Sequence, residues 1–271
     1  MILFSHAKIN VGLHILRKRD DGFHDIATLM IPIPFSDIIE LNATAAGKDF
    51  SLEQSGITVP GKQEDNLCYR SWKLFTDTAG PLPVKMHLHK QIPAGAGLGG
   101  GSSNAVTVLK GLNTLSGHKL NDRELHELAA RLGSDCSLFI ENRPAMATGR
   151  GEILETAKTD LSGYHLILLH PGVTVNTAWT YANIRPSEKR DRLDHLLAQP
   201  IHTWKTKVVN DFEPTIFEAY PAIAGLKAGL YLAGAVYTSM SGSGSAVYGL
   251  FEKEPELEPE LKKQLLWSGW I

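Results

Sequence analysis

Stretches in which hydrophobic and polar residues alternate recur in the first half of the chain. Residues 7–15 (AKINVGLHI) and 36–44 (SDIIELNAT) alternate well enough to predict two strands. In residues 83–90 (PVKMHLHK), every second position is apolar, so we expect a strand with one face buried. This spacing places the polar side chains of each strand on its opposite face.

Three segments of the first half show helical periodicity instead. Residues 66–80, 103–117 and 121–133 carry apolar residues at helical spacing, and each of these segments ends at a glycine. Asn121 opens the third segment and Glu124 follows three residues later, which predicts a capping box at its start.

The second half mixes the two patterns without strict alternation of strands and helices. A polar, turn-rich stretch at 155–163 suggests a domain boundary, and residues 164–172 (YHLILLHPG) predict a buried strand followed by a turn. Residues 187–199 and the tail 254–271 are charged and predict surface helices, whereas 237–253 predict a small-residue loop followed by a strand. This order favours an α+β fold over a doubly wound parallel sheet.

Composition narrows the class of protein. The 271 residues suffice for one large domain or two ordinary ones, and their formal net charge is −2 with a pI near 6.6. A nucleic-acid partner is not expected, because the chain lacks a basic footprint. No apolar run reaches the roughly 20 residues that span a bilayer, and no signal peptide is evident, so we expect a cytoplasmic protein without a membrane partner.

Cysteines and histidines give no sign of a metal site. Cys68 and Cys136 form neither a C-x-x-C pair nor a zinc-finger spacing, and we expect free thiols. His87 and His89 share one strand face, but no carboxylate cluster or H-E-x-x-H motif accompanies them.

The most distinctive segment is PAGAGLGGGSSNA at residues 93–105, where a predicted strand is followed by a glycine-rich turn and a predicted helix. The spacing of Gly95, Gly97 and Gly100 satisfies the dinucleotide motif G-x-G-x-x-G, but the acid about 20 residues on, Asp122, begins a helix instead of ending a strand. The spacing also fits a Walker A loop, but Gly101 occupies its lysine position.

A third interpretation requires only backbone N–H groups and a helix N-terminus, which together bind the phosphates of a nucleoside triphosphate. The alternative to all three is a tight packing turn without a ligand.

Several motifs in fixed order resemble the GHMP small-molecule kinases, the family of galactose, homoserine, mevalonate and phosphomevalonate kinases. The glycine loop resembles their signature. The remaining motifs resemble the branch that phosphorylates 4-diphosphocytidyl-2-C-methyl-D-erythritol in non-mevalonate isoprenoid biosynthesis. They are AKINVGLHILRKRDDGFHDIATL (7–29), EDNLCYR (64–70), LGSDCSLF (132–139), ATGRGEIL (147–154), HPGVTVNT (170–177), VNDFE (209–213) and SGSGSAVYGLF (241–251).

This resemblance implies a two-domain GHMP kinase fold, with an ATP-binding domain at 1–155, a C-terminal domain at 156–271 and the active site in the cleft between them. It implies ATP-dependent phosphorylation of the substrate's 2-hydroxyl, a magnesium ion whose ligands are not identified, and a monomer or weak homodimer. The alternatives are a sister kinase acting on homoserine or mevalonate, a nucleotide-binding protein without catalysis, and a dinucleotide-dependent oxidoreductase.

The resemblance also assigns site residues. Asp135 is expected to be the general base and Lys8 its partner. The residues expected to bind ATP are Asn66, Pro93, Ala94, Gly95, Ala96, Gly97, Leu98, Gly99, Gly100, Gly101, Ser102 and Ser103. The residues expected to bind the substrate are Asn10, Phe23, His24, Thr177, Ser241 and Gly242.

Without the resemblance, plainer structural interpretations compete for several of these residues. Asp135 is in a position to cap a helix, Lys8 to be a solvated strand lysine, and Asn66 to be an N-cap. Phe23 stands where the family usually has tyrosine. Ring stacking on a cytosine survives this change, but a hydrogen bond from the phenol does not.

Overall fold

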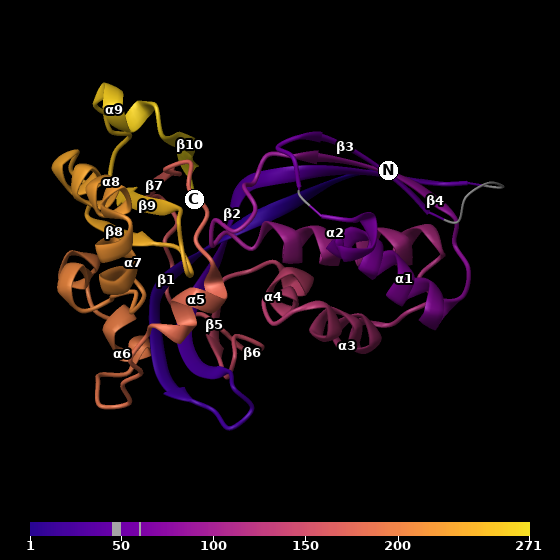
Figure 1. The fold of residues 1–271 in the computed structure, drawn as a ribbon, viewed down its shortest axis with the longest axis horizontal. Helices are drawn as coiled ribbons and strands as arrows, with labels where there is room; N and C mark the ends of the chain where they lie inside the picture. Colours follow the sequence, from indigo (N-terminus) through magenta and orange to yellow (C-terminus); the bar gives the residue numbers. More distant parts are fainter. Residues whose placement is uncertain (45–49, 60) are drawn as a thin grey trace. The chain divides into compact units, whose positions relative to one another are not determined.

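The computed structural model describes residues 1–44, 50–59 and 61–271, and Figure 1 labels its elements. The chain forms two compact units that are interleaved in sequence. The first unit contains residues 1–8, 35–94 and 99–143, and the second contains residues 9–34, 95–98 and 144–271. Strands β1 (Ile2–Lys18) and β2 (His24–Ala43) contribute residues to both units. The domain boundary expected at residues 155/156 assumes two domains that are each continuous in sequence, and this boundary stays a prediction.

The first unit is built on a mixed sheet. Strand β3 (Phe50–Gly56) runs parallel to β4 (Val84–Lys90), and β4 pairs antiparallel with the second half of β2, where Ile38 faces His89. The apolar positions of β4 are fully buried, as their alternation predicts.

Helices cover one side of these strands in Figure 1. They are the 3-10 helix η1 (Gln63–Asp65) and the helices α1 (Leu67–Ala79), α2 (Gly100–Leu115), α3 (Asp122–Leu132) and α4 (Cys136–Glu141). The capping box at Asn121 and Glu124 is confirmed, since each side chain accepts a hydrogen bond from the other residue's backbone N–H. Helix α2 begins three residues earlier than expected, inside the glycine loop, because burial of its apolar side outweighs the low helix propensity of glycine.

The second unit contains an antiparallel sheet in the order β10-β7-β9-β8. Its strands are β7 (His165–Leu169), β8 (Tyr237–Met240), β9 (Val247–Phe251) and β10 (Leu265–Trp270). The expectation of a helix over the tail is wrong for residues 265–270, which form strand β10. Within the tail 254–271, only the short α9 (Pro259–Lys262) is helical. The apolar end of the chain pairs with the fully buried strand β7 instead, with Trp270 opposite His165.

The remaining elements of the second unit are β5 (Ala145–Thr148), β6 (Ile153–Thr156), α5 (Thr177–Ala182), α6 (Leu193–Leu197), the 3-10 helix η2 (Ile201–Thr206), α7 (Glu213–Ala219) and α8 (Pro221–Leu232). The surface helix expected at 187–199 is reduced to α6. Only the leucines of this segment have a core to pack against, and the charged residues before them offer no apolar side for a helix to bury.

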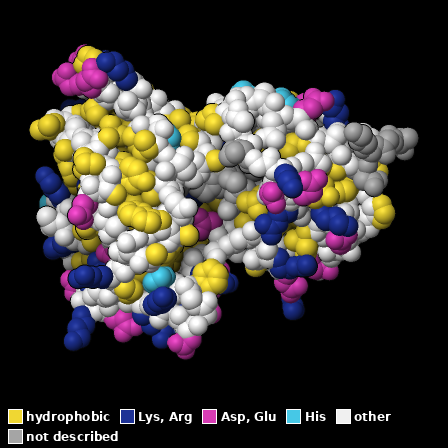
Figure 2. Space-filling view, in the orientation of Figure 1, with side chains coloured by type: hydrophobic (Ala, Val, Ile, Leu, Met, Phe, Trp, Pro, Cys, Tyr) yellow, Lys and Arg dark blue, Asp and Glu magenta, His cyan; other side chains and the backbone are white. Residues whose placement is uncertain are grey.

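The core of the second unit joins its helices to its sheet. Ile216 of α7 and Ile223 of α8 belong to the same buried cluster as Val247 and Phe251 of β9 and Ile15 of β1. Among the described residues, no helix combines the length and apolar character needed to cross a membrane. On the face drawn in Figure 2, the coloured Lys and Arg side chains alternate with Asp and Glu and form no single basic area.

Candidate active site

Lys8 and Asp135 are 127 positions apart in sequence, and the first unit brings them together. Nζ of Lys8 on β1 lies 3.6 Å from Oδ2 of Asp135, the residue before α4. Lys8 is only 3% exposed, so the interpretation as a solvated lysine is wrong. Asp135 makes no capping hydrogen bond through its side chain, so the capping interpretation is not supported either.

The two groups differ in their exposure to solvent. Burial lowers the pKa of the Lys8 ammonium from its usual value, and the charge of Asp135 opposes that shift. The side chain of Asp135 stays 33% exposed. The pair therefore consists of a buried cation that holds and orients a carboxylate still accessible to a ligand.

The glycine loop packs directly against this pair. A Cβ added at Gly99 would lie 3.1 Å from Cγ of Lys8 and 3.0 Å from Phe139, and the φ of Gly99 is +68°. A Cβ at Gly100 would lie 2.8 Å from Ile92. Glycine at these positions lets the start of α2 approach the lysine, which no other residue would allow.

The N-terminus of α2 has the features of an anion site. Its N-cap, Gly99, supplies no side-chain cap, so the first N–H groups of the helix lack the usual side-chain acceptor. Ser102 is half-buried in this first turn, whereas the Ser103 hydroxyl is buried and accepts a hydrogen bond from Ser5 at 2.8 Å. Backbone groups, with Ser102, are thus the donors available to an anion.

A pocket of about 240 Å³ lies beside the loop in the first unit and includes Ala94 and Gly101 in its lining. Asn66 lines it too, although its Oδ1 already accepts the N–H of Cys68 at 2.9 Å as the N-cap of α1. The structural interpretation of Asn66 is therefore confirmed, and its place in the pocket leaves a binding contribution open.

A buried ion pair, which the sequence analysis missed, lies beside the glycine loop and supports it. Lys90 pairs with Asp37, whose carboxylate also accepts hydrogen bonds from the N–H of Ile92 and the amide of Asn104. Burial lowers the pKa of Lys90, and Asp37 opposes the shift. The only sequence signal was a lysine at the last apolar-facing position of β4, where a buried charge needs a partner.

Four of the predicted residues meet in the second unit. The Ser241 hydroxyl donates a hydrogen bond to the carbonyl of Gly97 at 2.8 Å and accepts the N–H of Asn10 at 3.2 Å. A Cβ at Gly242 would lie 3.2 Å from Cα of Gly97 and 3.4 Å from Oδ1 of Asn10. The Asn10 amide also donates to Thr28 at 3.0 Å, so it has a structural part as well.

The other loop residues have plainer positions. The side chains of Ala96 and Leu98 are buried, which leaves only their backbone for a ligand, and Pro93 is half-buried. Gly95 packs near Thr174. Thr177, the first residue of α5, shares a hydrogen bond of 2.9 Å with Ser243 and so lies beside the loop that contains Ser241.

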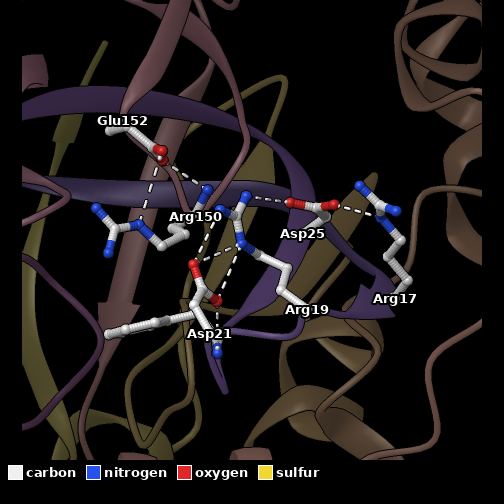
Figure 3. Close-up of polar contacts among 7 residues, drawn as sticks. Arg17, Arg19, Asp21, Asp25, Arg150 and Glu152 are labelled. Atoms are coloured by element: carbon white, nitrogen blue, oxygen red, sulfur yellow. Dashed lines mark hydrogen bonds and ion pairs between the residues drawn. The ribbon is translucent and has the colours of Figure 1, made fainter.

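The turn before β2 presents Phe23 to solvent, with 52% of the residue exposed. Charged side chains hold this turn: Arg19 donates hydrogen bonds to Asp21 and to Asp25, and Asp21 accepts the N–H of Phe23 at 3.1 Å (Figure 3). These bonds from Arg19 lower the pKa of both carboxyls. An exposed aromatic ring on a braced turn is unusual for a purely structural residue.

His24, the next residue, stacks on Tyr181 with ring centroids 5.1 Å apart. Burial lowers the pKa of His24, with a smaller contribution from Lys18, so the ring stays neutral near pH 7. Tyr181 of α5 was missed in the sequence, where it is one apolar position of a short helix.

Both cysteines are free thiols, as the sequence predicts. Cys68 and Cys136 are free and buried, and burial raises the pKa of both thiols. Across residues 1–44, 50–59 and 61–271, no group of three or more His, Cys, Asp or Glu residues is arranged to hold a metal ion.

Comparisons with known families agree over most of the chain. Residues 66–142 match the GHMP kinases N terminal domain, and residues 193–264 match the GHMP kinases C terminal domain. A 4-diphosphocytidyl-2-C-methyl-D-erythritol kinase of Bacteroides thetaiotaomicron is 43% identical over 95% of this chain and 94% of its own length. The enzyme of that name from Parabacteroides distasonis is 40% identical over the full length of both chains.

Solved structures show the same fold. A crystal structure of 4-(cytidine 5'-diphospho)-2C-methyl-D-erythritol kinase superposes with a TM-score of 0.80 at 30% identity, covering 99% of this chain and 98% of that one. A homoserine kinase from Cytophaga hutchinsonii shares the fold with a TM-score of 0.62 at 17% identity, covering 96% of this chain and 88% of its own. The chain therefore has the two-domain α+β fold of the GHMP kinases and belongs to their 4-diphosphocytidyl-2-C-methyl-D-erythritol kinase family.

Proposed function

We propose that this chain transfers the γ-phosphoryl group of ATP to the 2-hydroxyl of 4-diphosphocytidyl-2-C-methyl-D-erythritol, a step of non-mevalonate isoprenoid precursor biosynthesis. The Lys8–Asp135 pair, 3.6 Å apart beside the glycine loop, is the observation that carries the proposal. The relatives that bear this enzyme's name supply the substrate, since they are 40–43% identical over nearly the whole chain.

Asp135 accepts the proton of the substrate hydroxyl while the hydroxyl oxygen attacks the γ-phosphorus. The bond from that phosphorus to the β–γ bridging oxygen breaks, ADP leaves, and the proton remains on Asp135. Lys8 orients the carboxylate, and this positioning converts a bimolecular encounter into transfer within one complex.

The phosphates of ATP are held by the backbone N–H groups at the start of α2, over residues 93–103, with help from the Ser102 hydroxyl. The pocket beside Asn66 takes the nucleoside end. In the second unit, Phe23 and His24 hold the cytosine, and Asn10, Thr177, Ser241 and Gly242 contact the remainder of the substrate.

In this proposal a magnesium ion would accompany ATP and would neutralise charge on its phosphates. The described residues contain no cluster of three metal-binding side chains. Mg²⁺ usually takes one or two protein oxygens and completes its shell with phosphate oxygens and water. Ser102 supplies the candidate protein oxygen.

A sister activity is the alternative. Homoserine and mevalonate lack a nucleobase, so neither would use the exposed ring of Phe23 on its braced turn. The homoserine kinase is also far more distant, at 17% identity.

The test is a coupled ADP-release assay with the cytidyl substrate, homoserine and mevalonate side by side. We expect ATP-dependent turnover with the cytidyl substrate alone. Turnover with only homoserine or mevalonate would overturn the substrate. ATP binding without ADP release from any of the three would identify a nucleotide-binding protein instead.

A further inference from the structure

Arg150 covers one face of the exposed ring of Phe23. Its Cζ lies 4.8 Å from the ring centroid, which is the geometry of a cation–π contact. The residue Phe23 nevertheless stays 52% exposed, so the contact leaves much of the ring open. A flat group that approaches from solvent would therefore meet a ring whose other side is already packed.

Arg150 is itself held in place by its neighbour two residues on. Glu152 accepts the backbone N–H of Arg150 at 2.6 Å, and its other carboxylate oxygen lies 3.7 Å from Nε of the guanidinium (Figure 3). Both residues belong to the tight turn between β5 and β6, which also includes Gly149 at a φ of +66°. The arginine side chain thus starts from a fixed backbone and lies beside the Glu152 carboxylate at its Nε.

The ring it covers lies on a turn that is equally well fixed. The backbone N–H of Arg19 donates to the carbonyl of Phe23 at 2.8 Å, and Asp21 accepts the N–H of Phe23. These bonds fix the backbone but not the rotation of the side chain. A phenylalanine has no hydroxyl to anchor its ring, so the orientation of the ring depends on what packs against it.

We propose that Arg150 is a positioning residue for nucleobase recognition: it stacks behind Phe23 and holds the ring ready for the cytosine of the substrate. The inference rests on the proposed function, which assigns the cytosine to Phe23. Ordering an exposed side chain before binding removes part of the entropy that a ligand must otherwise overcome, which corresponds to roughly three- to tenfold in affinity.

Calorimetric titration with cytidine 5′-diphosphate tests this directly. Arg150→Ala should weaken binding roughly three- to tenfold and raise KM for the cytidyl substrate by the same factor, while kcat and the KM for ATP stay unchanged. Arg150→Met retains a long apolar side chain without charge and so separates packing from the cation–π attraction. Its affinity for cytidine 5′-diphosphate should lie between those of the wild type and Arg150→Ala.

Arg192→Ala is the matched control. Arg192 is an exposed arginine of the second unit that also pairs with a carboxylate two residues on, Asp194, and no aromatic contact of its side chain is found among the described residues. It should bind cytidine 5′-diphosphate like the wild type. A second measurement places Arg150→Ala in a Phe23→Leu background, where the arginine has no ring to position and should cause no further loss.

Three outcomes overturn the proposal: unchanged affinity and KM in Arg150→Ala, the same loss in Arg192→Ala, or an undiminished loss in the Phe23→Leu background. The proposed function fails separately. A wild-type protein that does not phosphorylate the cytidyl substrate, but whose affinity for cytidine 5′-diphosphate still depends on Arg150, would refute the reaction and keep the nucleobase site.

Discussion

The glycine loop at 95–101 and the turn at 19–24 both contain residues that we propose contact ligands, but different forces hold the two segments in shape. In the loop, a Cβ at Gly97 would lie 1.9 Å from the carbonyl oxygen of Ser241. In the turn, Gly22 also has a positive φ, of +83°, but a Cβ added there would have no atom within 4 Å. The loop depends on the absence of side chains, whereas the turn depends on the charged side chains of Arg19, Asp21 and Asp25.

This difference separates the tasks of the two regions. Close packing and largely buried ion pairs hold the loop, which suits the phosphate site that we propose beside Lys8 and Asp135. Exposed ion pairs are weak, so the support of the turn is more sensitive to solvent and salt than that of the loop.

The largest effect should come from the chemistry beside the loop. Asp135→Asn keeps the size of the side chain but removes the proton acceptor, so turnover should fall by roughly 10²–10⁴. ATP affinity, measured by calorimetry, should persist because the first turn of α2 is unchanged. Turnover near that of the wild type would remove Asp135 from the mechanism.

The second effect compares the two glycines. Gly97→Ala adds a clash to an unfavourable left-handed backbone and should lower the free energy of unfolding by about 2–5 kcal/mol. Gly22→Ala carries only the backbone strain and should cost about 1–2 kcal/mol. Urea unfolding of the two variants measures both, and equal losses would contradict the steric account of the loop.

The third effect is a pH dependence that separates the regions. Burial lowers the pKa of Lys8 below its usual 10.5 and that of His24 below its usual 6.5. We expect kcat to fall on the alkaline side, at a pH below 10.5, as Lys8 loses its proton. KM for the cytidyl substrate should rise on the acid side, at a pH below 6.5, as His24 gains one.

The stability of the protein changes with pH in the same direction for Lys8 and for His24. Between each lowered native pKa and the ordinary value, the unfolded chain binds more protons than the native one, so the free energy of unfolding rises with pH. Measurements of kcat and KM as functions of pH check the alkaline fall in kcat and the acid rise in KM. If KM rises on the acid side in His24→Gln as it does in the wild type, His24 is not the source of that rise.

The smallest effect is the response of the turn to salt. Raising ionic strength to about 1 M shortens the Debye length to roughly 3 Å and weakens exposed ion pairs. Affinity for cytidine, an uncharged probe, should fall by roughly two- to fivefold. Asp21→Asn should reduce this salt dependence, and an equal slope in that variant would show that the ion pairs do not support the turn.

Local structure was the most predictable part of the fold. The helix over 66–80, the capping box at Asn121 and the buried face of β4 follow from short-range patterns, and the structure confirms them. The tail at 265–270 shows where such patterns end. Its charged neighbours suggested a helix, but strand β7 offered an edge, and pairing across a sheet is not encoded by neighbours in sequence.

The site divides in the same way. The motifs by themselves determined the family and the order of the candidate residues, since each motif is a short run whose chemistry does not depend on distant contacts. Only the tertiary structure decided that Lys8 is buried against Asp135, that Lys90 pairs with Asp37, and that Arg150 covers Phe23. The reason is physical: the burial of a charge and the stacking of a ring depend on groups that folding brings together from distant parts of the chain.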